Sequence, residues 1–255
     1  MYYGIHSEFI ETPLLRILEE GIQACSPLGY GIQTEPVKEY FLSSLFLRMT
    51  GAQEQKMKSI CWELATHDYA FRRGFLDSAS NPRSYGEFSS LEQKERVYND
   101  LLRQIYSLNN RAVPSSCTCL HKYKSFFGRV CREVGSLLRR EPLCYWLQKE
   151  KQDLRNDSAV RSPQCGPSFK SKKEFRLLQG ELRVIYEPVV EAHRHRCAHN
   201  LTSIQKHLPS LSVLRDQNYS RHNYAYRFLI LILVDEIFME LYKEYKGLVN
   251  MSPWR

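Results

Sequence analysis

The chain has 255 residues, of which 43% are hydrophobic and 25% are charged. That balance is ordinary for a globular protein and excludes a disordered, collagen-like or low-complexity chain. The length suits one large domain or two small ones. Lysine and arginine total 36 residues against 28 for aspartate and glutamate. The resulting net charge of +8 permits a polyanionic partner without demonstrating one.

The N-terminal sequence and the longest apolar run predict a protein that is neither exported nor inserted in a membrane. The segment MYYGIHSEFIETPLL lacks a basic start followed by a long apolar stretch, so no secretory signal is expected. The apolar run 228–234 is closed by Asp235 and Glu236, and it is far shorter than the roughly 20 residues that a bilayer-spanning helix needs. We therefore expect a cytoplasmic protein.

Eight cysteines are spread along the chain, and in a cytoplasmic protein we expect them to be reduced thiols. One cluster, formed by Cys117, Cys119 and His121, has a spacing that could hold a metal. A zinc site usually takes four ligands as two spaced pairs, and no second pair is evident. Ordinary thiols at a helix start are therefore the favoured interpretation, and no cofactor is expected.

Helix signals follow one another along the first half of the chain. Thr12 followed by Pro13 predicts the start of a helix, and a second helix begins near Pro36. A Ser or Thr followed three residues later by Gln forms a capping box, which predicts further helix starts. These boxes lie at 50–53 and 90–93. The apolar stripe after the first start is Leu14, Leu15, Leu18 and Ile22. The stripe after Ser90 is Leu91, Lys94, Tyr98, Leu101, Ile105 and Leu108.

The second half of the chain continues in the same way around one polar interruption. A helical stripe runs from Leu120 to Leu138, and the last helix covers roughly 224–246. Residues 155–170 are polar, with two prolines and one glycine, and predict an internal linker. No stretch shows sustained alternation with a period of two. We therefore predict an all-α multi-helix bundle in which residues 1–255 form a single domain.

The helix that precedes Asn200 changes character toward its end. A third capping box at 171–174 predicts its start, and Pro188 predicts a kink. Its inward stripe is Leu178, Leu182, Ile185, Val189 and Ala192. Continuing the same steps leads to Arg196 and His199, so the core-facing side is predicted to become polar. Charged groups at core-facing positions are costly unless they are paired or functional.

The end of this helix reads EAHRHRCAHN, from Glu191 to Asn200, and holds three of the eight histidines. It resembles the signature of HEPN domains, in which an Arg, a polar residue, three further residues and a His lie near the end of a long helix. Arg194, His195 and His199 occupy these positions, although the family often has Asn or Asp where His195 stands. The resemblance covers the last third of the chain closely.

The resemblance implies both a fold and an activity. HEPN domains are helical bundles, and many act as metal-independent endoribonucleases in prokaryotic antiviral defence, abortive infection or toxin–antitoxin systems. It also implies a homodimer with a composite cleft, RNA as substrate, and an antitoxin or an activating partner that controls the enzyme. These expectations concern the family and do not follow from the composition or the helical periodicity of this chain.

The residue types in this segment suit the cleavage of RNA, independently of the resemblance to HEPN domains. Cleavage of RNA by its own 2′-hydroxyl needs a group that takes that proton, a group that protonates the leaving oxygen, and positive charge at the phosphate. Histidine titrates near neutrality, and arginine offers a bidentate, permanently charged fork. We assign general acid/base catalysis to His199, phosphate stabilisation to Arg194 and orientation of His199 to His195. The supporting residues are His193, Arg196, Asn200 and Glu191.

Helix geometry adds a constraint to this assignment. At about 100° per residue, His195 and His199 share one face of a helix, whereas Arg194 is about 140° away from His199. A single regular helix does not bring Arg194 beside His199. An unwound helix end or a second copy across a two-fold axis would do so, and the HEPN resemblance implies the second copy.

Other interpretations remain open. The motif residues could be surface charges that favour the negative end of the helix dipole. Arg215 with Asp216 and His222 form a looser Arg–polar–His pattern, which is predicted to be a loop. Two basic groups could contact a phosphate backbone or be solvated helix faces. They are Lys170, Lys172, Lys173 and Arg176, and Arg129, Arg132, Arg139 and Arg140. The alternative function is a non-catalytic helical module that binds RNA or a protein.

Overall fold

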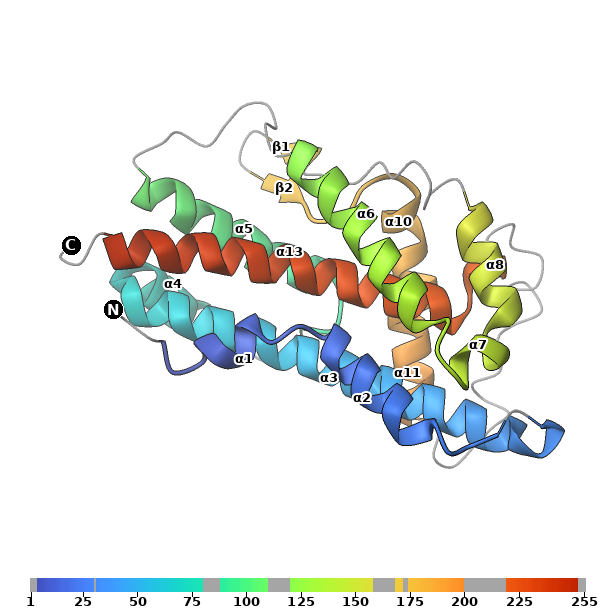
Figure 1. Cartoon of the computed structure of the whole chain (residues 1–255). Coiled ribbons are helices and arrows are strands. Elements are labelled where there is room, and N and C mark those ends of the chain that lie inside the picture. Colours follow the sequence, from blue (N-terminus) through green and yellow to red (C-terminus); the bar gives the residue numbers. More distant parts are fainter. Residues whose placement is uncertain are drawn as a thin grey trace.

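A computed structural model describes residues 4–29, 31–79, 88–109, 120–157, 168–171, 174–199 and 219–251. Within these segments nearly all regular structure is helical, which confirms the predicted all-α class. The two longest helices are α3 (Glu35–His67) and α13 (Tyr224–Met251), which lie alongside each other through the molecule (Figure 1). The shorter elements pack around this pair.

The remaining elements of the N-terminal half are α1 (Ser7–Glu11), α2 (Leu15–Cys25), the 3-10 helix η1 (Ile32–Thr34), α4 (Tyr69–Ala79) and α5 (Leu91–Leu108). Those of the C-terminal half are α6 (Leu120–Leu137), α7 (Leu143–Trp146), α8 (Gln148–Asn156), α10 (Gly180–Tyr186), the π-helical turn η2 (Glu187–Glu191), α11 (Ala192–His199) and the 3-10 helix η4 (Tyr219–Arg221). Two short strands, β1 (Ser168–Ser171) and β2 (Glu174–Arg176), form an antiparallel hairpin.

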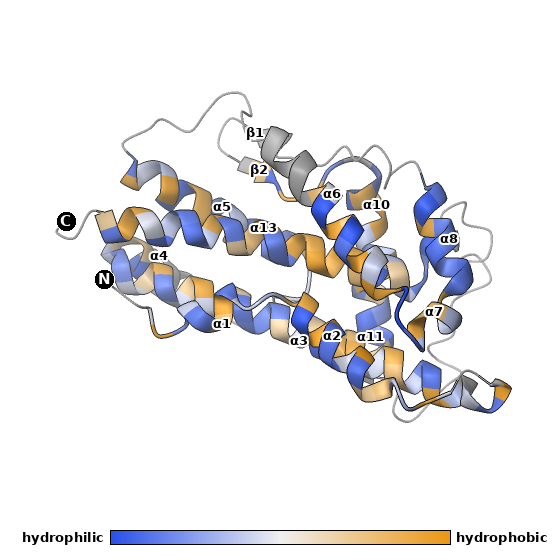
Figure 2. Cartoon of the chain, viewed as in Figure 1, coloured by the Kyte–Doolittle hydropathy of each residue, from blue (hydrophilic) through white to orange (hydrophobic). Residues whose placement is uncertain are grey.

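Helix α13 forms the centre of the core. Every residue from Tyr224 to Met239 is buried, as expected for a helix that is apolar around most of its circumference. It contacts α1, α3, α5, α6 and α8, and the buried apolar residues of the described segments form one cluster. Figure 2 shows the contrast between this apolar helix and the hydrophilic α8. None of the described helices has the combined length and apolarity needed to cross a membrane.

Two of the helix starts predicted from prolines and capping boxes are confirmed. Pro36 lies in the first turn of α3, where its missing N–H is not needed. At the start of α5, the Ser90 hydroxyl accepts from the Gln93 amide, and the Gln93 side chain accepts from the Ser90 amide, both at 3.2 Å. The first start is displaced, since Thr12 ends α1 and Leu14 is the N-cap of α2.

The predicted capping box at 50–53 is wrong, because both residues lie inside the continuous helix α3. The Thr50 hydroxyl donates to the backbone carbonyl of Leu47 within the same helix at 3.0 Å. The buried Gln53 amide donates instead to the Leu231 carbonyl of α13 at 3.0 Å. A tertiary partner, rather than the start of a helix, therefore explains the polar side chain at position 53.

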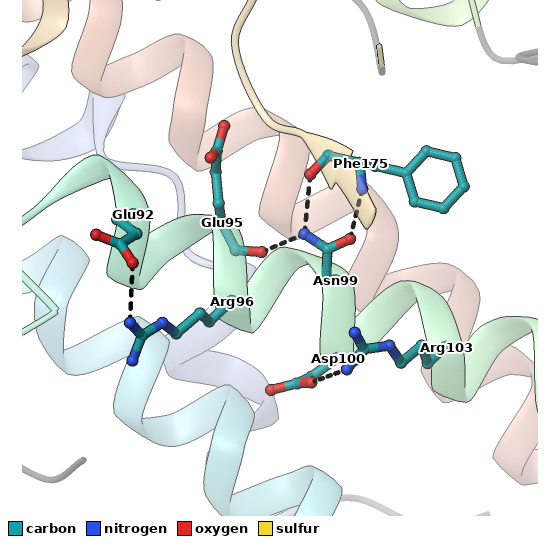
Figure 3. Close-up of a pocket in the computed structure, with 7 residues that line it drawn as sticks. All are labelled: Glu92, Glu95, Arg96, Asn99, Asp100, Arg103 and Phe175. Atoms are coloured by element: carbon teal, nitrogen blue, oxygen red, sulfur yellow. Dashed lines mark hydrogen bonds and ion pairs between the residues drawn. The ribbon is translucent and has the colours of Figure 1, made fainter. Parts of the chain in front are cut away.

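The predicted capping box at 171–174 is also wrong, because Ser171 ends strand β1 and Glu174 begins strand β2. Helix α5 holds the hairpin in place (Figure 3). The Asn99 amide nitrogen donates to the Phe175 carbonyl at 2.9 Å, and the Phe175 N–H donates to the Asn99 carbonyl oxygen at 2.7 Å. Glu95 accepts from the Leu177 amide at 3.0 Å. These side chains satisfy the backbone of β2 as a neighbouring strand would.

The predicted linker at 155–170 is structured at both of its ends. Its first two residues complete α8, and its last three belong to β1. Residues 158–167 lie outside the described part of the chain. The chain resumes its helical course at Gly180, whose φ of 53° falls in the left-handed region that glycine adopts without strain.

Candidate functional site

The kink predicted at Pro188 takes the form of the π-helical turn η2, which joins α10 to α11. Proline has no N–H for the usual helix bond, and a π-helical turn contains one additional residue. That residue rotates the following positions by about 100° relative to an uninterrupted α-helix. The predicted inward stripe is confirmed as far as Val189. The next inward position is the buried His193 rather than Ala192, and Arg196 is half-buried.

His193 lies in an aromatic environment between α3 and α13. Its ring centroid is 5.0 Å from that of Phe46 and 5.3 Å from that of Tyr224. Its Nε2 atom is 3.3 Å from the Cys197 thiol. Burial, reinforced by the charge of Arg227, lowers the pKa of His193 to about 2. The ring is therefore neutral at physiological pH, which suits a hydrogen-bonding role better than proton transfer.

Arg194 is held by a carboxylate of α3. Its Nε atom is 2.7 Å from Glu54 Oε1, and its Nη2 atom donates to Glu54 Oε2 at 3.0 Å. The Arg194 side chain is 21% exposed and the Glu54 side chain 12% exposed. Of these two contacts, the one at Nη2 is a hydrogen bond and the one at Nε is an ion pair, and together they hold the guanidinium group against the carboxylate. Nη1 of Arg194 has no partner among the described residues and keeps its donors for another group.

Two further charged residues border this ion pair. Glu191 accepts a hydrogen bond from the Leu91 amide and so caps the first turn of α5. The Lys94 ammonium group donates to the carbonyls of Phe88 and Ser89 at 2.7 and 2.8 Å. Burial lowers the pKa of Lys94 to about 8, although the Glu54 and Glu191 charges oppose the shift. Glu191, predicted as a supporting residue, thus joins η2 to α5.

We call Glu54, Lys94, Tyr186, Glu191 and Arg194 the polar cluster. Its members come from α3, α5, α10, η2 and α11, and the Tyr186 hydroxyl is buried without a hydrogen-bond partner among the described residues. Sequence reasoning found Arg194 and Glu191 but not Glu54. The signal for Lys94 was present, because a lysine at an inward position of an apolar stripe requires buried partners. The cluster places Arg194 among charges that fix its orientation.

Positive charge also gathers on the α13 side of α11. Arg227 is buried, with its guanidinium carbon 4.8 Å from the Tyr224 ring centroid and its Nε donating to the Val189 carbonyl at 3.1 Å. Burial lowers the pKa of Arg227 to about 10 and lowers the pKa of Arg196 as well. The Tyr224 hydroxyl donates to Glu39 at 2.7 Å. Two guanidinium groups thus lie near His193, and both are partly desolvated.

The other predicted residues are less closely grouped. His195 is exposed on α11, and His199 is the last residue of that helix, with its side chain outside the description. Arg176 belongs to β2, and His222 lies between η4 and α13. The remaining candidates fall outside the described residues: Cys117, Cys119, Lys172, Lys173, Asn200, Arg215 and Asp216. His121 lies in α6, and its side chain is not described. Among the side chains that are described, no three His, Cys, Asp or Glu residues form a metal-binding group.

A cavity of about 420 Å³ lies beside the hairpin, over α5 (Figure 3). Its charges are paired with one another. Arg96 binds Glu92 at 2.9 Å, and Arg103 binds Asp100 at 3.0 Å. Burial raises the pKa of Asp100 to about 6 despite the nearby Arg103 charge. With its cations neutralised in this way, the cavity offers little to an anionic ligand.

Comparison with known proteins assigns no family. No family model, no curated protein and no solved structure matches this chain. The function must therefore be argued from the residues of the chain itself.

Proposed function

We propose that the protein is a metal-independent endoribonuclease that cleaves RNA by attack of its own 2′-hydroxyl. One observation carries the proposal. Glu54 fixes the Arg194 guanidinium in a fork, on the eight-residue helix that also exposes His195 and ends at His199. A pre-oriented cation and histidines, carried on one short helix, are the residue types that phosphoryl chemistry on RNA requires. The resemblance to HEPN domains supports a role as a toxin or effector in prokaryotic antiviral defence.

The proposed roles follow from the positions of the groups. Arg194 stabilises the charge that develops on the phosphate through the donors that Glu54 leaves available. His199 transfers the proton, and His195 orients the His199 side chain. Because Arg194 turns toward α3 while His195 is exposed, we propose that the complete site combines residues of two copies of the chain. The buried, neutral His193 packs the helix rather than exchanging protons.

An RNA cleavage assay in the presence of EDTA tests the proposal. We expect the wild type to yield fragments that end in a 2′,3′-cyclic phosphate. We expect Arg194→Ala and His199→Ala to lose roughly a hundredfold or more of the rate, the scale typical of acid–base and electrostatic catalysis. Arg48→Ala is the matched control, because Arg48, a residue of α3, is also an arginine that forms an ion pair with a carboxylate. Equal cleavage by all four proteins would disprove the assignment.

The variant Glu54→Gln tests whether cleavage depends on the orientation of Arg194 as well as on its charge. The variant keeps Arg194 but weakens the fork that orients it. We expect the cleavage rate to fall while the KM for RNA changes little, because Glu54 is not proposed to touch the substrate. A variant that loses thermal stability but cleaves at the wild-type rate would show that the ion pair is structural only.

A non-catalytic binding module is the second candidate function. One observation favours it: Glu54 already balances the Arg194 charge within one chain, as a purely structural ion pair would. A module of this kind binds RNA or a protein partner and leaves the RNA intact. Binding of labelled RNA, followed on the same sample by gel analysis of its length, distinguishes the two functions.

A further inference from the structure

We propose that a pocket between α6 and α8 binds a small phosphate-bearing ligand the size of a mononucleotide. This site is separate from the polar cluster, and the proposal does not depend on RNA cleavage. The pocket has a volume of about 430 Å³ and is lined by residues of both helices. Sites for small ligands typically have volumes of about 300–1,000 Å³, so one nucleotide fits this space better than a polymer does.

Half of the residues that line the pocket are basic, and the wall between their charged groups is largely apolar. Four of its lining residues are basic: Arg132, Arg139, Lys151 and Arg155. No carboxylate is among the described residues that line it. Arginine forks are well suited to phosphate oxygens, because two parallel N–H groups match the spacing of two oxygens. The lining residue Ser136 adds a hydroxyl that can donate to the same oxygens.

Helical spacing explains why these groups converge. Arg132, Ser136 and Arg139 are separated by four and three residues, so the end of α6 and the turn after it present them on one side. Lys151 and Arg155 are four residues apart and share one face of α8. Two basic faces on neighbouring helices therefore enclose one space.

Two carboxylates close in sequence to Lys151 and Arg155 are engaged away from this pocket. Glu150 accepts from the Tyr224 and Ala225 amides at 3.1 and 3.4 Å, and so caps the start of α13. Asp157, just after α8, binds Arg221 with 2.5 and 2.8 Å contacts. Glu150 and Asp157 are thus engaged with α13 and η4, while Lys151 and Arg155 line the pocket beside α6.

The cations keep donors available for a ligand. Arg132 uses its Nε to bind the Gly128 carbonyl at 3.2 Å, which anchors the side chain and leaves both terminal nitrogens. Arg139 and Arg155 have no ion-pair partner among the described residues. This differs from the cavity over α5, where each arginine is paired with a carboxylate. Burial raises the pKa of the lining Cys131 thiol to about 12, so the wall carries no opposing charge.

Isothermal titration of the full-length protein with pyrophosphate and with a panel of mononucleotides tests the site. We expect the double variant Arg139→Ala/Arg155→Ala to weaken nucleotide binding by about a hundredfold, since a charge-assisted hydrogen bond contributes about tenfold. The control is Arg16→Ala/Arg48→Ala, which removes the same charge from two arginines that pair with Glu20. The control should bind nucleotide as tightly as the wild type.

A steric variant gives a second test that leaves every charge in place. Gly135 lines the pocket, and a Cβ at this position would meet no atom within 4 Å. Gly135→Phe should therefore fold and fill the space, abolishing nucleotide binding. Gly128→Phe is its matched control, because Gly128 lies on the same helix, is equally open and does not line the pocket.

Several results would overturn the proposal. One is a wild type that binds none of the phosphorylated probes, or that binds unphosphorylated nucleosides equally well. Another is a control double variant that loses as much affinity as the pocket variant. An uncleavable 2′-O-methyl oligonucleotide is titrated in parallel. If the pocket variants weaken binding of that oligonucleotide alone, the basic faces contact an RNA backbone and the small-ligand site is refuted.

Discussion

Helix α3 sends two neighbouring charged side chains into different surroundings. Lys56 points to α13 and pairs with Asp235 at 2.6 Å, with 3% and 1% of the two side chains exposed. Glu54 meets Arg194 of α11 at the edge of the core. Residues two positions apart lie about 200° apart around a helix, so the two pairs face different elements. The Lys56–Asp235 pair is shielded from solvent, whereas the Glu54–Arg194 pair is partly exposed and can be reached by a ligand.

The difference separates an ion pair sealed in the core from one that belongs to the proposed site. Desolvation lowers the pKa of Lys56 and raises that of Asp235. Their mutual contact, the Glu236 charge and the Leu14 amide, 2.7 Å from Asp235, oppose these shifts. Within the described part of the chain, the near-complete burial of both side chains keeps a substrate from reaching them. The ion pair of Glu54 with Arg194 is expected to contribute less to stability. Its arginine is proposed to bind a phosphate. Four predictions test this contrast.

The largest effect on stability is expected for the buried pair of Lys56 and Asp235. Asp235→Ala leaves the Lys56 ammonium buried without its counter-charge, which should lower the free energy of unfolding by about 3–5 kcal/mol. Urea denaturation followed by circular dichroism measures the loss. The double variant Lys56→Met/Asp235→Asn removes both charges, keeps an acceptor for the Leu14 amide and should regain most of the stability. A loss below about 1 kcal/mol in the single variant would contradict the structural role.

His193 should make the protein sensitive to acid. Its pKa is about 2 in the folded state, against about 6.5 when unfolded. The unfolded state therefore binds the extra proton below pH 6.5, and stability is lost as the pH falls through that range. The loss should approach about 1.4 kcal/mol per pH unit, or about 2 kcal/mol at pH 5.

Urea titrations of the wild type and of His193→Gln between pH 8 and pH 5 measure this contribution. The two stability curves should run parallel above pH 7, where the ring is neutral in both states. Below pH 6.5 the wild type should fall more steeply than the variant. Parallel curves over the whole range would show that His193 is solvated and not buried against Phe46 and Tyr224.

His193 also shows where prediction from sequence ends. The apolar pattern predicts the buried course of α13 and the inward stripe up to Val189, because local periodicity determines both. Beyond Val189 the π-helical turn shifts the phase by one residue, and hydropathy alone does not encode that insertion. The sequence could therefore locate the motif helix but not decide which of its histidines is buried.

The hairpin and the polar cluster escaped prediction for a related reason. Glu174 to Arg176 form a strand because Asn99 and Glu95, more than seventy residues earlier, bind the backbone there. Glu54 becomes part of the site only because α11 packs against α3. Both features depend on contacts between distant segments, which propensities and capping patterns do not report.

A smaller effect is expected in the accessible pair. Arg194→Ala should lower the free energy of unfolding by roughly 1–2 kcal/mol, between the values for exposed and for fully buried pairs. A double-mutant cycle with Glu54→Ala isolates the interaction, and a coupling well below the Lys56–Asp235 value is expected. If the two pairs couple equally strongly, the distinction between a structural and a functional pair on α3 fails.

The smallest effect is expected for the ion pair of Arg48, which lies about one and a half turns before Glu54 on α3. Arg48 pairs with Glu20 at 3.1 Å while 62% and 45% of the two side chains are exposed. Arg48→Ala should therefore cost only about 0.2–1 kcal/mol, because water screens the attraction and two long side chains must be ordered to make it. High salt should remove even this contribution, since the Debye length falls to about 3 Å at 1 M. A salt-resistant loss as large as that of Arg194→Ala would mean that burial does not govern the ion pairs of α3. The partial exposure of Arg194 would then no longer distinguish it as a residue held for a ligand.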